Sequence, residues 1–537
     1  MPENGLRRDK RWASLWICAI LALSVLPYLA AWLAAPDGLT FGGILYNPLD
    51  GNSYLAKMRQ GWQGDWLFHL PFTEEPHDGA FIFTFYLLLG HLARVLNLSL
   101  PLVFHLARLA ASAFMMAMFW RLLGRFFADA AERKRAFLLV AVGAGVGWLF
   151  PTAEPLFPDL WIPEAFTFYS VLSNPHFPLA LGLMAGIAEM ALAVSQGEAF
   201  GGEATKQGEC RARMSRLHVW AGICGLALAV VQPFAVPVAA AVLGVFTVFQ
   251  AVRRLPWKPA FGMLLAAMVP ALPVLGYDWW VYGHNPALAA WSAQNVTASP
   301  PAWHWLVAYG LLALLACAGV YTAIRRSPSP LDLPALWLFV AAAGMYVPFA
   351  LQRRFSMGLQ IPVGVLAAAG LGALTAKARA GIRRWAFALM LGVASLSAAT
   401  LLMLGIVGGA SGESRLFLAH DEAAALAELR GQSGGQGVVL ASPALSAFVP
   451  AWAGNPVVYG HPYETIRAEQ KKADVERFFG DADEGYRSRF LTEHRVALLI
   501  IGPRERAMAS GLSPESLGMR LLLRQGEVEV WAAEGQP

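Results

Sequence analysis

The sequence predicts an α-helical protein that crosses a membrane many times and ends in a small soluble α/β domain. Of its 537 residues, 57% are hydrophobic and only 14% are charged, whereas a soluble domain usually has about a quarter charged residues. The hydrophobic residues occur in blocks of about 16 to 23, and a transmembrane helix needs roughly 20. Short polar turns separate these blocks, as is typical of a polytopic membrane protein.

Charge is distributed unevenly along the chain. Residues 413–537 contain 13 Lys and Arg against 17 Asp and Glu, a net charge of −4, while the rest contains 28 against 19, a net charge of +9. This difference indicates a membrane part with basic loops and an acidic soluble tail. We therefore expect a transmembrane domain over residues 1–411 and an extracytoplasmic α/β domain over residues 412–537. We expect no nucleic-acid partner.

Basic residues set the direction of each span, because loops rich in Lys and Arg stay in the cytoplasm. Arg7 to Arg11 place the N-terminus inside, and the loop from Lys206 to Arg216 is also cytoplasmic. These clusters agree only if the apolar run 80–96 lies in the outer interface, where His91 and Arg94 avoid full burial. About eleven spans result, at about 12–33, 101–120, 136–150, 178–195, two over 218–252, 260–276, 304–324, 333–350, 357–376 and 385–407. The last span delivers the tail to the outer side of the plasma (inner) membrane.

Arg353 and Arg354 are the exception to this charge rule. They lie between two apolar stretches, in a turn that the span count places outside the cytoplasm. One interpretation is a salt bridge to an outer-loop carboxylate, with the second arginine exposed to solvent. The other is a phosphate site, because guanidinium groups match phosphate oxygens in pairs. The nearby Pro348, Pro362 and Gln360 favour spans shaped around a polar cavity, and so favour the phosphate site.

The first outer loop, residues 36–100, contains the candidate catalytic acid. Asp50 lies between a proline two residues before it and Gly51, so we expect it to open a helix near the membrane surface. It is either a simple helix N-cap, or a catalytic base or cation ligand. Tyr54, in the same polar segment, is a candidate substrate-binding residue.

Later in the same loop, Glu74, Glu75, His77 and Asp78 supply four ionisable groups within five residues. The group is compatible with substrate binding, proton transfer or a divalent cation. The alternative is a solvated polar turn. A divalent cation is the one cofactor that the sequence suggests, and its ligands stay open.

His176 stands at the outer mouth of the predicted fourth span, directly after Pro175. It either positions an acceptor hydroxyl or a phosphate, or caps the membrane interface through a satisfied hydrogen bond.

The tail alternates helical and strand patterns, which predicts a small α/β domain. We expect helices at 421–430 and 467–479 and strands at 437–441, 456–459, 496–501 and 527–531, the last of which closes the sheet. The turn from Tyr459 to Thr465 follows a strand, a position where sites are often built. This turn either helps to bind an acceptor or has a structural role.

An Asp shortly after the first span, followed by interfacial helices and a second outer loop rich in Pro and aromatic residues, resembles the GT-C glycosyltransferases. The protein-O-mannosyltransferase and aminoarabinose-transferase type is the most similar subgroup, and the resemblance covers roughly residues 12–407. Family members often have a second acid beside the first, where this chain has Gly51. The second acid would then come from Glu74 or Asp78, or be absent.

The resemblance implies transfer of a sugar from a polyprenyl-phosphate carrier to an acceptor glycan, lipid or protein on the outer face of the membrane. Asp50 would deprotonate or orient the acceptor, His176 would assist, and Arg353 and Arg354 would hold the carrier phosphate in the same cavity. Two alternatives remain, a transporter or flippase for lipid-linked sugars and a non-catalytic assembly subunit.

Overall fold

The computed structural model describes residues 3–197, 207–480, 483–508 and 511–533. The part of the predicted inner loop around Lys206 lies outside these residues. The chain divides into two compact units. The helical unit comprises residues 1–26, 106–277 and 296–404, and the mixed unit comprises residues 27–105, 278–295 and 405–537.

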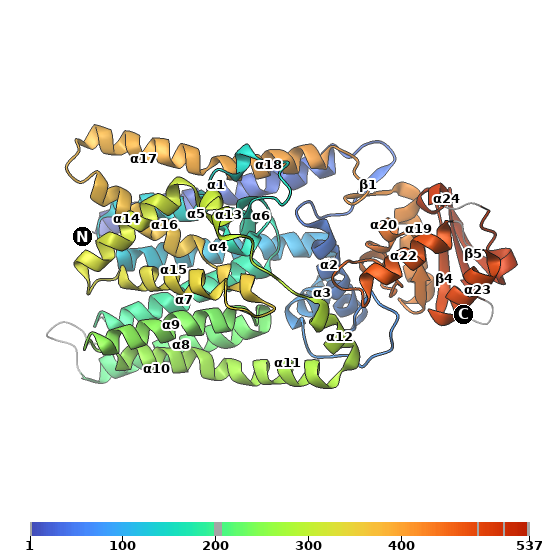
Figure 1. Ribbon diagram of the computed structural model, residues 1–537, viewed down its shortest axis with the longest axis horizontal. Helices are drawn as coiled ribbons and strands as arrows, with labels where there is room; N and C mark the ends of the chain where they lie inside the picture. Colours follow the sequence, from blue (N-terminus) through green and yellow to red (C-terminus); the bar gives the residue numbers. More distant parts are fainter. Residues whose placement is uncertain (1–2, 198–206, 481–482, 509–510, 534–537) are drawn as a thin grey trace. The chain divides into compact units, whose positions relative to one another are not determined.

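Apolar helices of different lengths form the helical unit, and the longer ones run roughly parallel to one another (Figure 1). They are α5 (Ala130–Val142), α6 (Thr167–Leu172), α7 (His176–Ser195), α8 (Gln207–Val231), α9 (Ala235–Val252), α10 (Lys258–Met268), α13 (Ala302–Tyr309), α14 (Leu311–Arg326), α15 (Asp332–Gly344), α16 (Gln360–Leu374) and α17 (Ala380–Ala394). Four helices run from one unit into the other, namely α1 (Glu3–Leu33), α4 (Leu100–Phe126), α11 (Leu272–His284) and α18 (Leu396–Gly409).

The membrane character of the chain is confirmed, but eleven spans are not. Within the described residues, eight helical segments are long and apolar enough to cross a membrane, and the bent pair α13 and α14, with an angle of 95°, would make nine. Two predicted spans, α5 and α15, have only 13 residues each, fewer than the roughly 20 that a span needs. The α5 helix ends before a glycine-rich stretch, in which a Cβ on Gly147 would lie 2.1 Å from the Asp159 carboxylate.

The mixed unit contains the first outer loop. Helices α2 (Pro48–Gln63), α3 (Thr84–Leu96) and α12 (Pro286–Gln294) belong to it. The α3 helix coincides with the apolar run predicted to lie in the interface, and its 13 residues are too few to span a membrane. Glycine allows α2 and α3 to approach closely, because a Cβ on Gly90 would lie 2.0 Å from the carbonyl oxygen of Met58.

A four-stranded sheet in the order β3-β4-β6-β5 forms the core of the tail. Its strands are β3 (Val438–Leu440), β4 (Val496–Ile501), β5 (Met519–Gln525) and β6 (Val528–Ala533). The β3 and β4 strands are parallel, and the other pairs are antiparallel. Every residue of β4 is buried, as expected for an apolar run in the middle of a sheet.

Helices surround this sheet (Figure 1). They are α19 (His420–Ser433), α20 (Pro443–Ser446), α21 (Val449–Trp452), α22 (Ala468–Phe479), α23 (Glu484–Glu493) and α24 (Pro503–Met508).

One strand prediction was wrong, and another strand was correct but lies elsewhere in the sheet than expected. Residues 456–459 form only an isolated bridge, between Val457 and Val439. The predicted strand at 527–531 corresponds to β6, which lies inside the sheet, so the edge is β5, a strand that we did not predict.

The first outer loop packs against the tail in one unit. Strand β1 (Leu39–Phe41) pairs with β2 (Phe417–Ala419), with Leu39 opposite Ala419. Farther along, the Val457 N–H donates to the Pro71 carbonyl at 3.1 Å. The predicted boundary after residue 411 assigned this loop to the membrane domain, whereas its contacts group it with the tail.

Candidate active site

Asp50 lies in the first turn of α2, where its carboxylate meets the positive end of the helix dipole. The helix starts at Pro48, and the N-cap position is occupied by Asn47, with a left-handed φ of 52°. The simple N-cap interpretation of Asp50 was therefore wrong, since it is the third helical residue. Its Oδ2 accepts a hydrogen bond from the Asn47 side chain, and 39% of its side chain is exposed.

His461, from the C-terminal tail, faces this carboxylate. Its Nε2 lies 3.3 Å from Asp50 Oδ1, and its side chain is 2% exposed. Its Nδ1 accepts the backbone N–H groups of Tyr463 and Glu464, each at 3.1 Å. Nε2 is buried and has no partner in hydrogen-bond geometry within the described part of the chain. An acid and an imidazole from distant parts of the sequence are thus brought together.

A buried ion pair joins the same two segments. Glu464 Oε1 accepts from Ser53 Oγ at 2.5 Å and from Lys57 Nζ at 2.9 Å. Lys57 is fully buried, and its ammonium group lies 4.6 Å from the centre of the Phe83 ring. Burial alone would raise the pKa of Glu464, but the nearby Lys57 ammonium lowers it below its usual value. Desolvated charges need this pairing, so the contact fastens the tail to α2.

The predicted polar turn from Tyr459 to Thr465 is held on several sides. Thr465 Oγ1 accepts the backbone N–H of His461 at 3.2 Å, and Gln294 Nε2 donates to the Thr465 carbonyl at 2.7 Å. A Cβ on Gly460 would lie 2.7 Å from the Ser446 carbonyl oxygen, so glycine permits the close approach here. Tyr463 is 62% exposed at the tip of the turn.

Glu74 and Glu75 form a second contact between loop and tail. Lys471 Nζ, 2% exposed, lies 2.6 Å from Glu74 Oε2 and 2.7 Å from Glu75 Oε2. The other oxygens face His494 Nδ1 at 2.6 Å and Arg467 Nη2 at 3.1 Å. Burial opposes ionisation of Glu75, but hydrogen bonds from Lys471, Thr73 and Arg467 lower its pKa to about 2.

The other two polar residues of this segment, His77 and Asp78, have separate surroundings. His77 Nε2 accepts the Leu70 N–H at 2.8 Å, and its Nδ1 donates to the Glu75 carbonyl at 2.7 Å. Burial lowers the pKa of His77. Asp78 is exposed. Among the described residues, no three His, Cys, Asp or Glu side chains are placed together to hold a metal ion, and the divalent cation stays a prediction.

In the helical unit, Arg353 and Arg354 lie in a short 3₁₀ helix, Gln352–Ser356, and both face Glu164. Arg354 Nη1 lies 3.0 Å and Arg353 Nε 4.0 Å from the same carboxylate oxygen. The Glu164 side chain is 3% exposed, and those of the arginines are 19% and 23% exposed. The Arg353 guanidinium also lies 4.8 Å from the Trp161 ring centre. The predicted salt bridge is present, and the phosphate role stays a prediction.

Asp159, in the segment that precedes Glu164, is a buried acid. Its Oδ2 accepts the Gly147 N–H at 3.1 Å and the Ser397 hydroxyl at 2.6 Å. Burial raises the pKa of Asp159 to about 6. These contacts connect the segment to α18.

The remaining candidates are buried or stacked. His176 is the first residue of α7 and is 4% exposed, so it is not open to solvent at the start of that helix. Gln360 is 1% exposed, and its Nε2 donates to the Leu139 carbonyl of α5 at 2.8 Å. Tyr54 stacks on Tyr86, with ring centres 4.4 Å apart.

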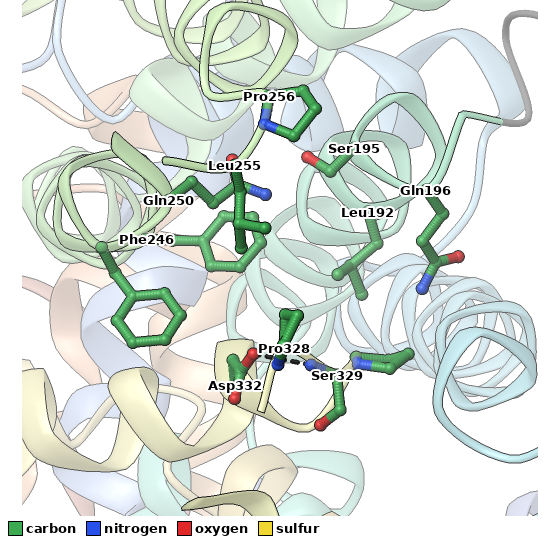
Figure 2. A pocket seen from close by; sticks show the side chains of 12 residues that line it. Leu192, Ser195, Gln196, Phe246, Gln250, Leu255, Pro256, Pro328, Ser329 and Asp332 are labelled. Atoms are coloured by element: carbon green, nitrogen blue, oxygen red, sulfur yellow. Dashed lines mark hydrogen bonds between the residues drawn. The ribbon is translucent and has the colours of Figure 1, made fainter. Parts of the chain in front are cut away.

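A cavity of about 210 Å³ lies between the ends of α7 and α9 and the start of α15 (Figure 2). Ser195, Gln250 and Ser329 line it, and each has a buried oxygen without a hydrogen-bond partner within the described residues. Asp332 accepts the Ser329 N–H at 2.8 Å at its edge. The predicted orientation places these helix ends at the cytoplasmic side, so this cavity is not the expected site of transfer.

Sequence reasoning singled out Asp50 as a candidate but did not predict that the tail contacts α2 beside it. His461 and Glu464 lie in a turn that we singled out without assigning a contact. Lys57 offered one usable signal, a lysine inside an amphipathic helical stretch, because a buried lysine requires an anionic partner.

Comparison of the sequence with protein-family models and with curated proteins gives no match. Among solved structures, the archaeal oligosaccharyltransferase AglB from Archaeoglobus fulgidus, in complex with an inhibitory peptide and a dolichol-phosphate, is similar with a TM-score of 0.58. The match covers 91% of this chain and 69% of that chain at 13% identity. The arabinofuranosyltransferase AftD from Mycobacteria is similar with a TM-score of 0.55, over 97% of this chain and 40% of that chain, at 14% identity.

This chain has the GT-C glycosyltransferase fold. The fold extends over almost the whole sequence, because both matches cover more than nine-tenths of it. ArnT from Cupriavidus metallidurans aligns over 98% of this chain and 100% of that chain, with a lower TM-score of 0.49 and 17% identity. The two matches with the higher TM-scores confirm the predicted fold class, a polytopic helical protein with a small α/β domain in its tail. Identities this low describe the fold alone, so the chemistry must come from the residues themselves.

Proposed function

We propose that this protein is a membrane glycosyltransferase that moves a sugar from a polyprenyl-phosphate-linked donor to an acceptor on the extracytoplasmic face. The GT-C fold and the multiple apolar helices support this reaction class. One observation carries the chemical assignment. Asp50 presents a carboxylate that is 39% exposed at the start of α2, beside the buried imidazole of His461.

The proposed step is a displacement at the anomeric carbon of the sugar. The acceptor oxygen forms a bond to that carbon, and the carbon–oxygen bond to the carrier phosphate breaks, with its electron pair leaving on the phosphate. Asp50 accepts the proton of the acceptor hydroxyl, as a general base does. Asp50 lies in the first turn of α2, where the helix dipole favours a negative charge.

We assign Arg353 and Arg354 to the phosphate of the carrier. Their planar guanidinium groups suit phosphate oxygens, and both are partly exposed. Charge developing on the departing phosphate would be stabilised there. Glu164 holds the two side chains in place before the donor binds. His176 and Gln360 are too deeply buried for direct contact with a substrate, so we give them no part in the step.

Turnover by the full-length protein in detergent tests this proposal. Undecaprenyl-phosphate-linked pentoses and hexoses serve as probes, and released undecaprenyl phosphate is measured. Asp50→Asn should lower the rate about 100- to 10,000-fold, the usual contribution of a general base, with little change in melting temperature. Asp65→Asn, an exposed acid in the same loop, is the matched control and should behave as wild type.

Two results would contradict the proposal. Full activity of the Asp50→Asn variant would remove the base from the mechanism. Binding of undecaprenyl phosphate by the wild-type protein without turnover of any probe would contradict the enzyme assignment and favour a transporter or an assembly subunit.

A further inference from the structure

We propose that His461, contributed by the soluble tail, is a positioning residue for Asp50. This inference rests on the proposed function, in which Asp50 takes the acceptor proton. It starts from the 3.3 Å separation between His461 Nε2 and Asp50 Oδ1. Since the two residues come from opposite ends of the sequence, the transfer step would require the tail as part of its machinery.

The surroundings of the imidazole determine where its proton lies. Nδ1 accepts two backbone N–H groups, those of Tyr463 and Glu464. A ring nitrogen that accepts hydrogen bonds carries no proton, so the proton is on Nε2. Nε2–H therefore faces the Asp50 carboxylate as a donor. For the same reason His461 cannot be the base, because neither nitrogen has a lone pair available to an acceptor hydroxyl.

The turn that carries His461 is rigidly attached to α2. Glu464, three residues later, binds Ser53 and Lys57. Asp50, Ser53 and Lys57 are spaced three and four residues apart, so they lie on one face of the helix. The position of Nε2 relative to α2 is thus set by a buried ion pair, while the Asp50 side chain keeps substantial exposure.

The state of Nε2 points to a role beyond packing. The atom is buried, yet it makes no hydrogen bond within the described residues, and buried donors without partners are uncommon enough to need an explanation. A small rotation of the Asp50 side chain would bring its Oδ1 into hydrogen-bond geometry with His461 Nε2. With Asn47 Nδ2 donating to Oδ2, two donors would then fix the plane of the carboxylate and align it with the acceptor hydroxyl.

Two substitutions separate positioning from structure. Gln places an amide N–H near the location of Nε2 but provides no acceptor for the turn. Asn places an acceptor oxygen near the location of Nδ1 and preserves the turn, but it cannot reach Asp50. A merely structural histidine would therefore be replaced better by Asn, and a positioning histidine better by Gln.

The experiment compares His461→Gln, His461→Asn and His461→Ala in full-length protein, with the same undecaprenyl-phosphate-linked sugars. We expect kcat of His461→Gln to stay within a few-fold of wild type. In His461→Asn and His461→Ala, kcat should fall about 100-fold, the scale of a 1 Å misplacement, with the donor KM unchanged. Adding His461→Ala to Asp50→Asn should produce no further loss, because the two act as one unit.

Equal activity of the Gln and Asn variants would overturn the inference, as would a loss that multiplies with that of Asp50→Asn. If Asp50→Asn is inactive while His461→Asn is fully active, only the positioning role fails. If Asp50→Asn is active, the proposed function fails as well. Melting temperatures of all variants identify any loss that comes from unfolding.

Discussion

Two acidic sites of the first outer loop face the tail. They differ in how closely tail nitrogens approach the carboxylates and in how exposed the carboxylates are. At Glu74 and Glu75, all four carboxylate oxygens are within 3.1 Å of a nitrogen from Lys471, His494 or Arg467. At Asp50, the nearest tail nitrogen is 3.3 Å away without hydrogen-bond geometry. The Glu74 side chain is 8% exposed, and that of Asp50 is 39% exposed.

This difference separates a structural site from a candidate functional one. Carboxylates whose oxygens are all used by protein donors cannot bind a substrate without first losing those bonds. A partly exposed carboxylate beside a donor that is not yet satisfied can respond to a ligand. Both sites contain acids of the kind found in catalytic centres, so residue type alone does not distinguish them, whereas the exposed fraction of the carboxylate does.

The largest expected effect comes from removing the shared lysine of the structural site. Lys471→Met leaves two carboxylates without their buried cation, which should cost about 3–5 kcal/mol and lower the melting temperature on the order of 10 °C. Lys472→Met is the control, because Lys472 is 48% exposed and lies 3.9 Å from Glu476, an arrangement worth about 0.5 kcal/mol or less. Equal melting temperatures for the two variants would show that the site is not structural.

Much of the membrane architecture could be predicted, because local composition determines it. The first span was expected at Trp12 to Leu33, and an apolar helix extends over Arg7–Leu33. Strand β4 was found because six consecutive buried apolar residues leave few alternatives. Strand β5 was missed, since an edge strand with exposed Arg520 and Leu521 lacks a clear alternation. The local sequence pattern does not predict a helix or strand whose length or end is determined by tertiary contacts.

The candidate site could be predicted only in part. Asp50 was found from its local sequence, the proline and glycine that surround it. Its partners could not be found in this way, since Ser53 and Glu464, which hold the two segments together, are 411 positions apart. Glu74 and Glu75 were grouped correctly in the sequence, but their cations come from the tail. No local pattern indicates that pairing.

Exposure can also be compared at the arginine pair, where the Arg353 and Arg354 side chains are 19% and 23% exposed. Both lie within 4.0 Å of the same Glu164 oxygen. Arg353→Gln should weaken binding of undecaprenyl phosphate about 10- to 100-fold, the value of a charge-assisted hydrogen bond. Glu164→Gln should act in the opposite direction and tighten binding, because it removes the anion that competes with the phosphate. Binding is measured by titration of the detergent-solubilised protein, with Arg325→Gln as an exposed control. Unchanged affinity in both variants would make the pair a structural salt bridge.

The smallest effect is a pH dependence that belongs to the structural site. The pKa of Glu75 falls from 4.5 to about 2 in the fold, so its ionised form stabilises the native state fully above pH 4.5. That contribution is lost as the pH falls from 4.5 towards 2, because protonation breaks the contacts with Lys471 and Arg467. Glu75→Gln should therefore melt below wild type at pH 7, and the gap should narrow through this window. Glu469→Gln, at an exposed position of the tail, should show no such gap at any pH. A gap that persists unchanged at pH 3 would mean that the shape of the Glu75 side chain, and not its charge, holds the loop against the tail.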